Sequence, residues 1–169
     1  MTIEQAIRTG IEYELQVRKV YSEAAKNFAD PIARRVLGVL ADEEDRHVEY
    51  LESRLNEWQR SGKVTAAKLE TAIPSKRAID ASLKKLTRRM AQQDYSRELA
   101  MLRKALELEI EATNFFRRMV AELEAEERKL FSRFVEIEEG HEAIVQAEID
   151  AVSGLGFWFD YSEFKLEGA

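Results

Sequence analysis

The chain has two histidines, and both end the same short pattern, in which a glutamate stands three residues before the histidine. The pairs are Glu44 with His47 and Glu138 with His141. Residues three positions apart lie on one face of a helix, so each pair can present a carboxylate and an imidazole to a single cation. Two such helices that face each other can therefore hold two metal ions between them.

The two pairs belong to a longer internal repeat. A glutamate stands 30 residues before Glu44 and another 29 residues before Glu138, namely Glu14 and Glu109. Each half of the chain therefore predicts one helix with a single inward glutamate, followed by a helix with Glu-x-x-His. A duplicated helical hairpin explains this spacing, and it is the ligand arrangement of a carboxylate-bridged two-metal bundle.

The periodicity of apolar residues predicts that these side chains point into a protein core. In all four expected helices, apolar residues recur at helical spacing, and ionisable side chains interrupt the apolar stripe. Asp30 followed by Pro31 is typical of a helix start, with an N-cap residue and then proline at the first helical position. The inward ionisable side chains, which are the candidate metal ligands, are Glu14, Glu44, His47, Glu109, Glu138 and His141.

The composition favours one soluble, all-α domain. Hydrophobic residues make up 45% of the 169 residues and charged residues 34%, while glycine and proline occur only seven and two times. We expect a single-domain four-helix bundle with a long crossover between its second and third helices. The expected segments are hairpins over residues 3–58 and 96–152, a crossover over 61–95 with a short helix over 77–90, and a docked aromatic tail over 154–169.

Several classes of function are excluded or disfavoured. With no cysteine in the chain, disulfides, thiolate zinc sites, iron–sulfur clusters and thiol catalysis are impossible. The net charge of −6 disfavours nucleic acid as a partner, and we interpret the basic run at residues 84–89 as a solvated helix face. No run is apolar enough for a membrane span, and the N-terminus lacks a signal-peptide pattern, so we expect no membrane partner and a cytoplasmic location.

Charge balance indicates how many cations the cluster would bind, and the donor types indicate which metal. Four inward glutamates are balanced by two divalent cations, and neutral imidazoles complete the ligand shells without adding charge. Mixed carboxylate and imidazole ligands favour two iron ions, with manganese as the alternative, over calcium or structural zinc. We expect two bridging glutamates, and one glutamate with one histidine on each metal. The bridging residues are Glu44 and Glu138, and the terminal pairs are Glu14 with His47 and Glu109 with His141.

Two further side chains near these positions have alternative interpretations. The Tyr21 hydroxyl, two helical turns after Glu14, is a candidate to hydrogen-bond a ligand carboxylate and take part in catalysis, although a tyrosine there can also be a plain core residue. Glu43 lies one turn before His47 and can replace Glu44 as the ligand if the helix is rotated slightly. Otherwise we expect a group of neighbouring glutamates to be solvated, consisting of Glu12, Glu43, Glu107, Glu111 and Glu139.

Over residues 3–152 the chain resembles the rubrerythrin branch of the ferritin-like di-iron proteins. The resemblance is carried by Glu14 with Tyr21, by Glu109 and by the two Glu-x-x-His pairs, and it implies a ferritin-like bundle. Two positions depart from that family's pattern. Ala112 stands where those proteins carry an extra carboxylate associated with iron movement during peroxide turnover, and Phe116 replaces a second tyrosine.

The resemblance implies an oxidoreductase that reduces hydrogen peroxide, or that oxidises Fe(II) with O2 or peroxide, usually as a homodimer and sometimes with helix pairs exchanged between subunits. The rubredoxin domain of full-length rubrerythrins needs four cysteines, so we expect a separate electron donor protein here. Two other functions remain open. One is an iron-storage or cargo protein with incidental ferroxidase activity, and the other is a di-iron hydroxylase of an organic substrate.

Overall fold

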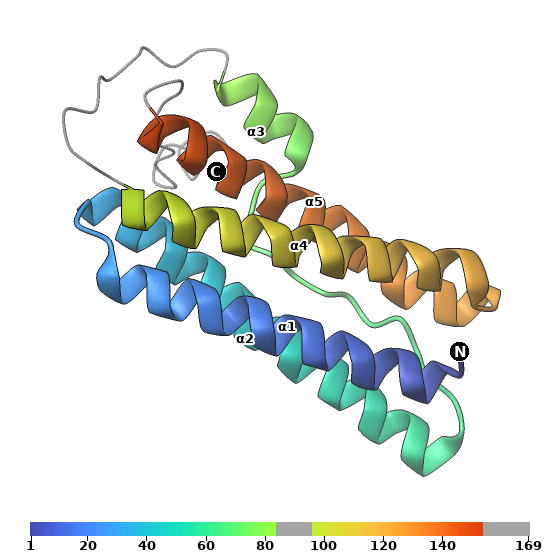
Figure 1. Cartoon of the computed structure of the whole chain (residues 1–169). Helices are drawn as coiled ribbons and strands as arrows, with labels where there is room; N and C mark the ends of the chain where they lie inside the picture. Colours follow the sequence, from blue (N-terminus) through green and yellow to red (C-terminus); the bar gives the residue numbers. More distant parts are fainter. Residues whose placement is uncertain (84–95, 154–169) are drawn as a thin grey trace.

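A computed structural model describes residues 1–83 and 96–153, and these residues form helices and no strand. Four long helices lie alongside one another as a helical bundle, and a short helix sits beside one end (Figure 1). The all-α expectation is confirmed for the described residues. The helices are α1 (Ile3–Asn27), α2 (Pro31–Ser61), α3 (Lys76–Leu83), α4 (Ser96–Glu122) and α5 (Ala125–Val152).

The ends of the first two helices are set by local sequence signals. Thr2 and Gln5 form a capping box at the start of α1, each side chain bonding to the other residue's backbone N–H. Asp30 caps α2 as expected, accepting hydrogen bonds from the backbone N–H groups of the second and third helical residues at 2.8 and 3.0 Å. At the other end, Gly62 adopts the left-handed conformation with φ of 65°, which glycine reaches without strain, and α2 stops there.

The turn between α4 and α5 has no comparable signal. It consists of Leu123 and Glu124, and Glu124 occupies the N-cap of α5 without making a side-chain capping bond. Leu123 is buried, and its backbone N–H continues the helical pattern by bonding to the carbonyl oxygen of Met119 at 3.0 Å. The turn contains no glycine or proline, and it is held by burial of the Leu123 side chain and by Arg128, whose guanidinium donates a hydrogen bond to the carbonyl oxygen of Leu123 at 3.1 Å.

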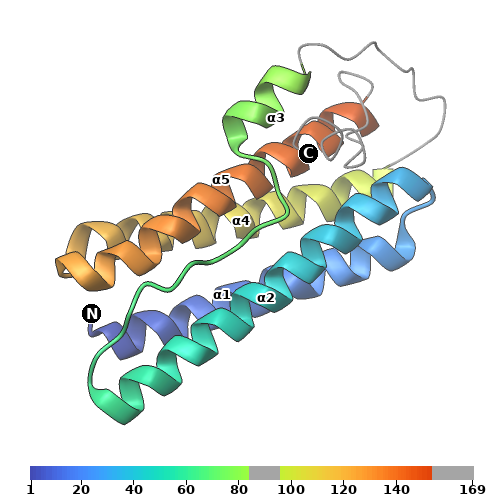
Figure 2. The same cartoon turned by 180° about the vertical axis from the view of Figure 1, so that it is seen from behind.

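Three sides of the bundle are made by direct helix packing. Helix α1 packs on α2, α4 packs on α5, and α1 packs on α4. The fourth side, between α2 and α5, is crossed by an extended stretch that runs from the end of α2 to α3 (Figure 2). We call residues 62–75 the crossover segment. Its apolar side chains Val64, Leu69 and Ile73 are buried, so the segment forms part of the core.

The core is divided into two apolar clusters. One contains Tyr21, Phe28 and Leu40 and lies toward the end of the bundle at which the turn connects α1 to α2. The other contains Ile7, Phe131 and neighbouring aromatic residues and lies toward the end at which the turn connects α4 to α5. Ionisable side chains are buried between these clusters. Because a buried charge is unfavourable unless it is paired, the side chains of this middle layer must balance one another's charge or bind an ion.

Some expectations extend beyond the described residues. The short helix expected over residues 77–90 begins at Lys76 and is described as far as Leu83, and the rest of that prediction lies outside the described ranges. The same is true of the basic run at residues 84–89 and of the aromatic tail after Ser153. Among the described helices, none has an apolar stretch of the length that crossing a bilayer requires.

Candidate metal centre

The structure brings all six candidate ligands together in the middle of the bundle. Helix α1 contributes one glutamate, α4 contributes one glutamate, and α2 and α5 each contribute a glutamate and a histidine. None of these side chains exposes more than 1% of its surface. The cluster therefore joins four helices and is shielded from solvent. Its members are Glu14, Glu44, His47, Glu109, Glu138 and His141.

Ligand atoms of the cluster form two overlapping sets, each able to hold a metal ion. Within each set of four residues, the ligand atoms lie within 4.8 Å of one another. Glu44 and Glu138 belong to both sets, as expected for bridging carboxylates. The other members are Glu14 with His47 in the first set, and Glu109 with His141 in the second.

Both imidazoles turn the same nitrogen toward the carboxylates. The Nδ1 atom of His47 lies 2.9 Å from Oε2 of Glu14, 3.3 Å from Oε2 of Glu44 and 3.2 Å from Oε1 of Glu138. The two histidine rings stack nearly parallel, with their centroids 5.4 Å apart and an angle of 8° between the planes. Each ring is thus oriented with Nδ1 as the atom available to a cation.

The second histidine repeats this arrangement in the other set. Its Nδ1 atom lies 2.8 Å from Oε1 of Glu44, 3.0 Å from Oε2 of Glu138 and 3.5 Å from Oε1 of Glu109. Despite these short distances, Nδ1 of His141 has no hydrogen-bond partner among the described residues. The nitrogen therefore sits among three carboxylates at distances that suit ion pairing rather than directional bonding.

Oxygen atoms of the cluster are also left without hydrogen-bond donors. Both carboxylate oxygens of Glu44 and of Glu138 are buried and have no hydrogen-bond partner in the described part of the chain. The same is true of one carboxylate oxygen of Glu14 and one of Glu109. Buried polar atoms in native proteins nearly always have a partner, and a bound ion can take the place of a missing donor. The donor set, with carboxylate and imidazole and no thiolate, fits a transition-metal cation.

The pKa values of the cluster show how it balances its charge by proton binding. Burial, together with the negative charges of Glu138 and Glu44, raises the pKa of Glu14 well above its ordinary value and that of Glu109 to about 8. Burial also opposes ionisation of Glu44 and Glu138, but the positive imidazoles outweigh it and lower the pKa of both. At neutral pH the shared glutamates are therefore ionised, Glu109 is mostly protonated, and protonation of Glu14 is favoured in the same direction.

The imidazoles complete this balance. Burial disfavours their charged form, but the charges of Glu138 and Glu44 prevail and raise the pKa of His47 and of His141 well above the ordinary value. Two protonated imidazoles then face two ionised carboxylates. A cation that enters the cluster replaces these protons, because it supplies the same positive charge at the same place.

Tyr21 forms the contact with a cluster carboxylate that its position led us to expect. Its hydroxyl donates a hydrogen bond to Oε1 of Glu109, across the bundle from α1 to α4. Burial, followed by the nearby charge of Glu109, raises the pKa of Tyr21 well above its usual range, so the hydroxyl keeps its proton. In the second half Phe116 has no hydroxyl and packs against Phe131 and Phe134, with ring centroids 5.9 and 4.8 Å away.

One prediction about the surroundings was wrong. Glu43 was expected to be solvated, but it exposes none of its surface. The reason is the crossover segment, which covers this face of α2 and supplies hydrogen-bond donors from Thr71 and from the backbone N–H of Ala72. Glu43 belongs to neither four-residue set, although one of its oxygens lies within 4.8 Å of ring nitrogens of His47 and His141.

A second buried carboxylate was not identified from the sequence. Glu148 lies two helical turns after His141 on α5 and is fully buried, but it belongs to none of the ligand sets found among the described residues. The apolar residues around it, such as Ile144 and Ile149, are a signal that could have suggested its burial. The other glutamates expected to be solvated are exposed or partly exposed, namely Glu12, Glu107, Glu111 and Glu139.

Comparison of the chain with protein-family models, with curated proteins and with solved structures found no match.

Proposed function

We propose that this protein is a di-iron oxidoreductase of the rubrerythrin type, which reduces hydrogen peroxide or oxidises Fe(II) at a carboxylate-bridged binuclear centre. The observation that carries the proposal is the pair of overlapping ligand sets that share Glu44 and Glu138. A single cation would need only one such set. Two sets joined by two shared carboxylates are the arrangement of di-metal carboxylate bundles, and they support a ferritin-like interpretation of the fold.

The choice of iron follows from the donor atoms. Each set offers three carboxylates and one imidazole nitrogen, with no sulfur. Calcium and magnesium prefer shells made only of oxygen, and structural zinc sites usually contain thiolates, whereas iron and manganese accept mixed oxygen and nitrogen ligands. When bound, two irons supply the electrons with which peroxide or O2 is reduced. Manganese is the second candidate for the same ligands.

The residues around the cluster favour a small oxidant over an organic substrate. The Phe134 ring packs against His47, with centroids 5.2 Å apart, and Phe116 packs against Phe134 in turn. Two surface pockets of the described chain, of about 890 and 800 Å³, are lined by none of the six cluster residues. A hydroxylase needs space for its substrate next to the metals, whereas peroxide or O2 needs very little. This arrangement counts against the hydroxylase alternative.

The chain itself places a hydrogen-bond donor beside the centre but has no cysteines for a second, rubredoxin-type iron site. Tyr21 keeps its proton and donates it in a hydrogen bond to Glu109, so its hydroxyl orients that carboxylate. Reduction of one H2O2 to two waters consumes two electrons and two protons. The chain has no cysteine and therefore no rubredoxin-type iron site, so we propose that a separate electron donor protein re-reduces the irons.

Anaerobic loading with Fe(II), followed by metal analysis, tests the proposal. We expect about two irons per chain in the wild type and a clear loss in Glu109→Ala, which removes a terminal ligand. The matched control is Glu107→Ala, because Glu107 lies on the same helix but is exposed and pairs with Lys104 at 2.8 Å. Equal iron contents in wild type and Glu109→Ala would reject the binuclear site.

Stopped-flow mixing of the iron-loaded protein with H2O2 and, separately, with O2 then distinguishes the reactions. Much faster oxidation by peroxide supports peroxide reduction, and faster oxidation by O2 supports a ferroxidase. Iron uptake far beyond two per chain, or a large closed oligomer, would instead favour the storage alternative.

A further inference from the structure

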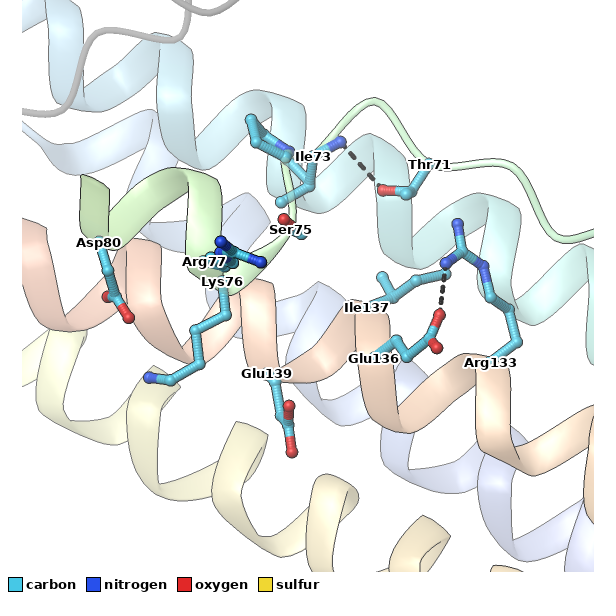
Figure 3. A pocket seen from close by; sticks show the side chains of 11 residues that line it. Thr71, Ile73, Ser75, Lys76, Arg77, Asp80, Arg133, Glu136, Ile137 and Glu139 are labelled. Atoms are coloured by element: carbon cyan, nitrogen blue, oxygen red, sulfur yellow. Dashed lines mark hydrogen bonds and ion pairs between the residues drawn. The ribbon is translucent and has the colours of Figure 1, made fainter. Parts of the chain in front are cut away.

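The crossover segment closes the side of the bundle on which α2 and α5 face each other. One face of it borders a surface pocket of about 890 Å³, which is also lined by α3 and by α5 (Figure 3). The opposite face contacts the helices that carry both histidines. Thr71 belongs to both faces, because it lines the pocket and its hydroxyl donates a hydrogen bond to Oε2 of Glu43 at 2.5 Å.

Glu43 accepts three hydrogen bonds, more than any carboxylate of the ligand sets accepts from the described residues. One of its oxygens accepts the backbone N–H of Ala72 at 3.0 Å and a guanidinium N–H of Arg46, and the other accepts Thr71. The ion pair with Arg46 and the three hydrogen bonds to its oxygens favour the ionised carboxylate. Glu43 is therefore a fixed, negatively charged group in the buried interior.

This fixed charge lies beside both imidazoles. A carboxylate oxygen of Glu43 and one ring nitrogen from each of His47 and His141 all lie within 4.8 Å of one another. The Nε2 atoms of both rings are buried and have no hydrogen-bond partner among the described residues. When Nδ1 binds a cation, Nε2 carries the ring proton, and a nearby carboxylate stabilises and orients the ring in that form.

The internal repeat shows that this carboxylate is particular to one half. Glu43 precedes Glu44 just as Ile137 precedes Glu138, and Ile137 is buried and apolar. On α5 the crossover segment instead passes close to Gly140, where an added Cβ would lie 3.2 Å from the carbonyl oxygen of Pro74. The segment is thus bonded to α2 through Glu43 and packed on α5 through Gly140, at the level of the two histidines.

We propose that Glu43 is a positioning residue, which the crossover segment holds in place so that its carboxylate fixes the orientation of the His47 and His141 imidazoles for metal binding. This inference rests on the proposed function, because it assumes that both imidazoles bind metal. It assigns Glu43 a role outside the ligand sets, and it gives the crossover segment a function beyond connecting two hairpins.

Titration with Co(II), followed by its visible ligand-field absorption, tests this role. Glu43→Gln keeps the shape of the side chain and removes its charge. We expect it to weaken Co(II) binding by about 10- to 100-fold and to change the absorption spectrum, since the rings are no longer held in one orientation. Glu43→Asp, which restores the charge, should recover part of the affinity, and Thr71→Val, which removes one donor, should give a smaller loss.

The matched control is Glu139→Gln. Glu139 is adjacent in sequence to the ligand Glu138, as Glu43 is to Glu44, but it is partly exposed and pairs with Arg117 at 2.9 Å. It should leave both affinity and spectrum unchanged. Wild-type affinity and spectrum in Glu43→Gln would overturn the positioning role, and so would equal losses in Glu43→Gln and Glu139→Gln.

Two further results keep the test decisive. Should circular dichroism show that Glu43→Gln does not fold, a wild-type spectrum and affinity in folded Thr71→Val would overturn the role, and a weakened, altered site would support it. If the wild type itself fails to bind two Co(II) per chain, the proposed function fails before any variant is compared. If the wild type binds two Co(II) per chain and Glu43→Gln has the same affinity and spectrum, only the role of Glu43 is rejected.

Discussion

The first hairpin, α1 and α2, and the second, α4 and α5, present the same ligand types from equivalent positions but surround them differently. At three equivalent positions near the ligands, the first hairpin has a polar residue where the second has an apolar residue or glycine. The equivalent pairs are Tyr21 and Phe116, Glu43 and Ile137, and Arg46 and Gly140.

This difference separates two kinds of constraint. The ligands are repeated because four buried carboxylates require balancing positive charge, and both hairpins share that requirement. The neighbours differ because each side of the bundle packs against something different. The crossover segment needs hydrogen-bond acceptors on α2, which Glu43 provides, and space on α5, which Gly140 provides. The two ligand sets are therefore similar in their residue types and unequal in the residues that support them.

The largest effect should come from the carboxylates that the two hairpins share. Glu44→Ala or Glu138→Ala removes a member of both ligand sets, so we expect metal content to fall from two per chain to almost none. Glu14→Ala removes a member of one set and should leave about one metal per chain. Equilibrium dialysis with metal analysis measures both. If Glu44→Ala retains as much metal as Glu14→Ala, the two positions do not share ligands as described.

The second-largest expected effect is a fall in the thermal stability of the metal-free protein as pH rises. Folding raises the pKa of Glu109 from 4.5 to about 8 and raises the pKa of both histidines above 6.5. The folded, metal-free protein therefore binds more protons than the unfolded chain at neutral pH, and its stability falls as pH rises. We expect its melting temperature to drop by more than about 5 °C between roughly pH 5 and pH 9.

Two controls accompany that measurement. The metal-loaded protein should show a weaker dependence over the same range, because cations replace the protons of the cluster. Glu109→Gln should remove the part of the slope that comes from this carboxyl group. A melting temperature of the metal-free protein that stays constant or increases toward pH 9 would contradict the charge balance described for the cluster.

The smallest effect concerns the hydroxyl that only one hairpin provides. Tyr21→Phe removes the donor to Glu109, so we expect about tenfold weaker binding at the position formed by Glu109 and His141 and little change at the other. The control is Tyr50→Phe, which removes a hydroxyl that donates to the carbonyl oxygen of Ala67 at 2.7 Å, outside the cluster. Equal metal titrations of the two variants would show that Tyr21 is only a core residue.

The parts of the fold that could be predicted from the sequence are those with local or periodic signals. Asp30 and Pro31 mark the start of α2, and helical spacing places Glu14 and Glu109 on inward faces. The two Glu-x-x-His pairs converge because each interrupts an otherwise apolar stripe. An ionisable residue on such a stripe must be buried with a partner, so the pattern predicted that these side chains lie together in the core.

The parts that could not be predicted depend on contacts distant in sequence. Glu43 lies beside the apolar stripe of α2, and it is buried only because Thr71 and Ala72, nearly thirty residues later, lie over it. An extended segment without strand pairing has no periodic signal, so its course across α2 and α5 cannot be read from the sequence. The position of the turn at Leu123 and Glu124 is also hard to read from the sequence, since no glycine, proline or N-cap side chain marks it.

The shared ligand sets make each half of the chain dependent on the other. The first set takes Glu138 from the second hairpin, and the second set takes Glu44 from the first. Neither hairpin alone contains a complete set. If the backbone were cut at the exposed stretch of residues 65–68, the two fragments would have to reassociate before either ion could be fully ligated. Metal binding would then hold the two fragments together, and their reassociation would depend on the metal concentration.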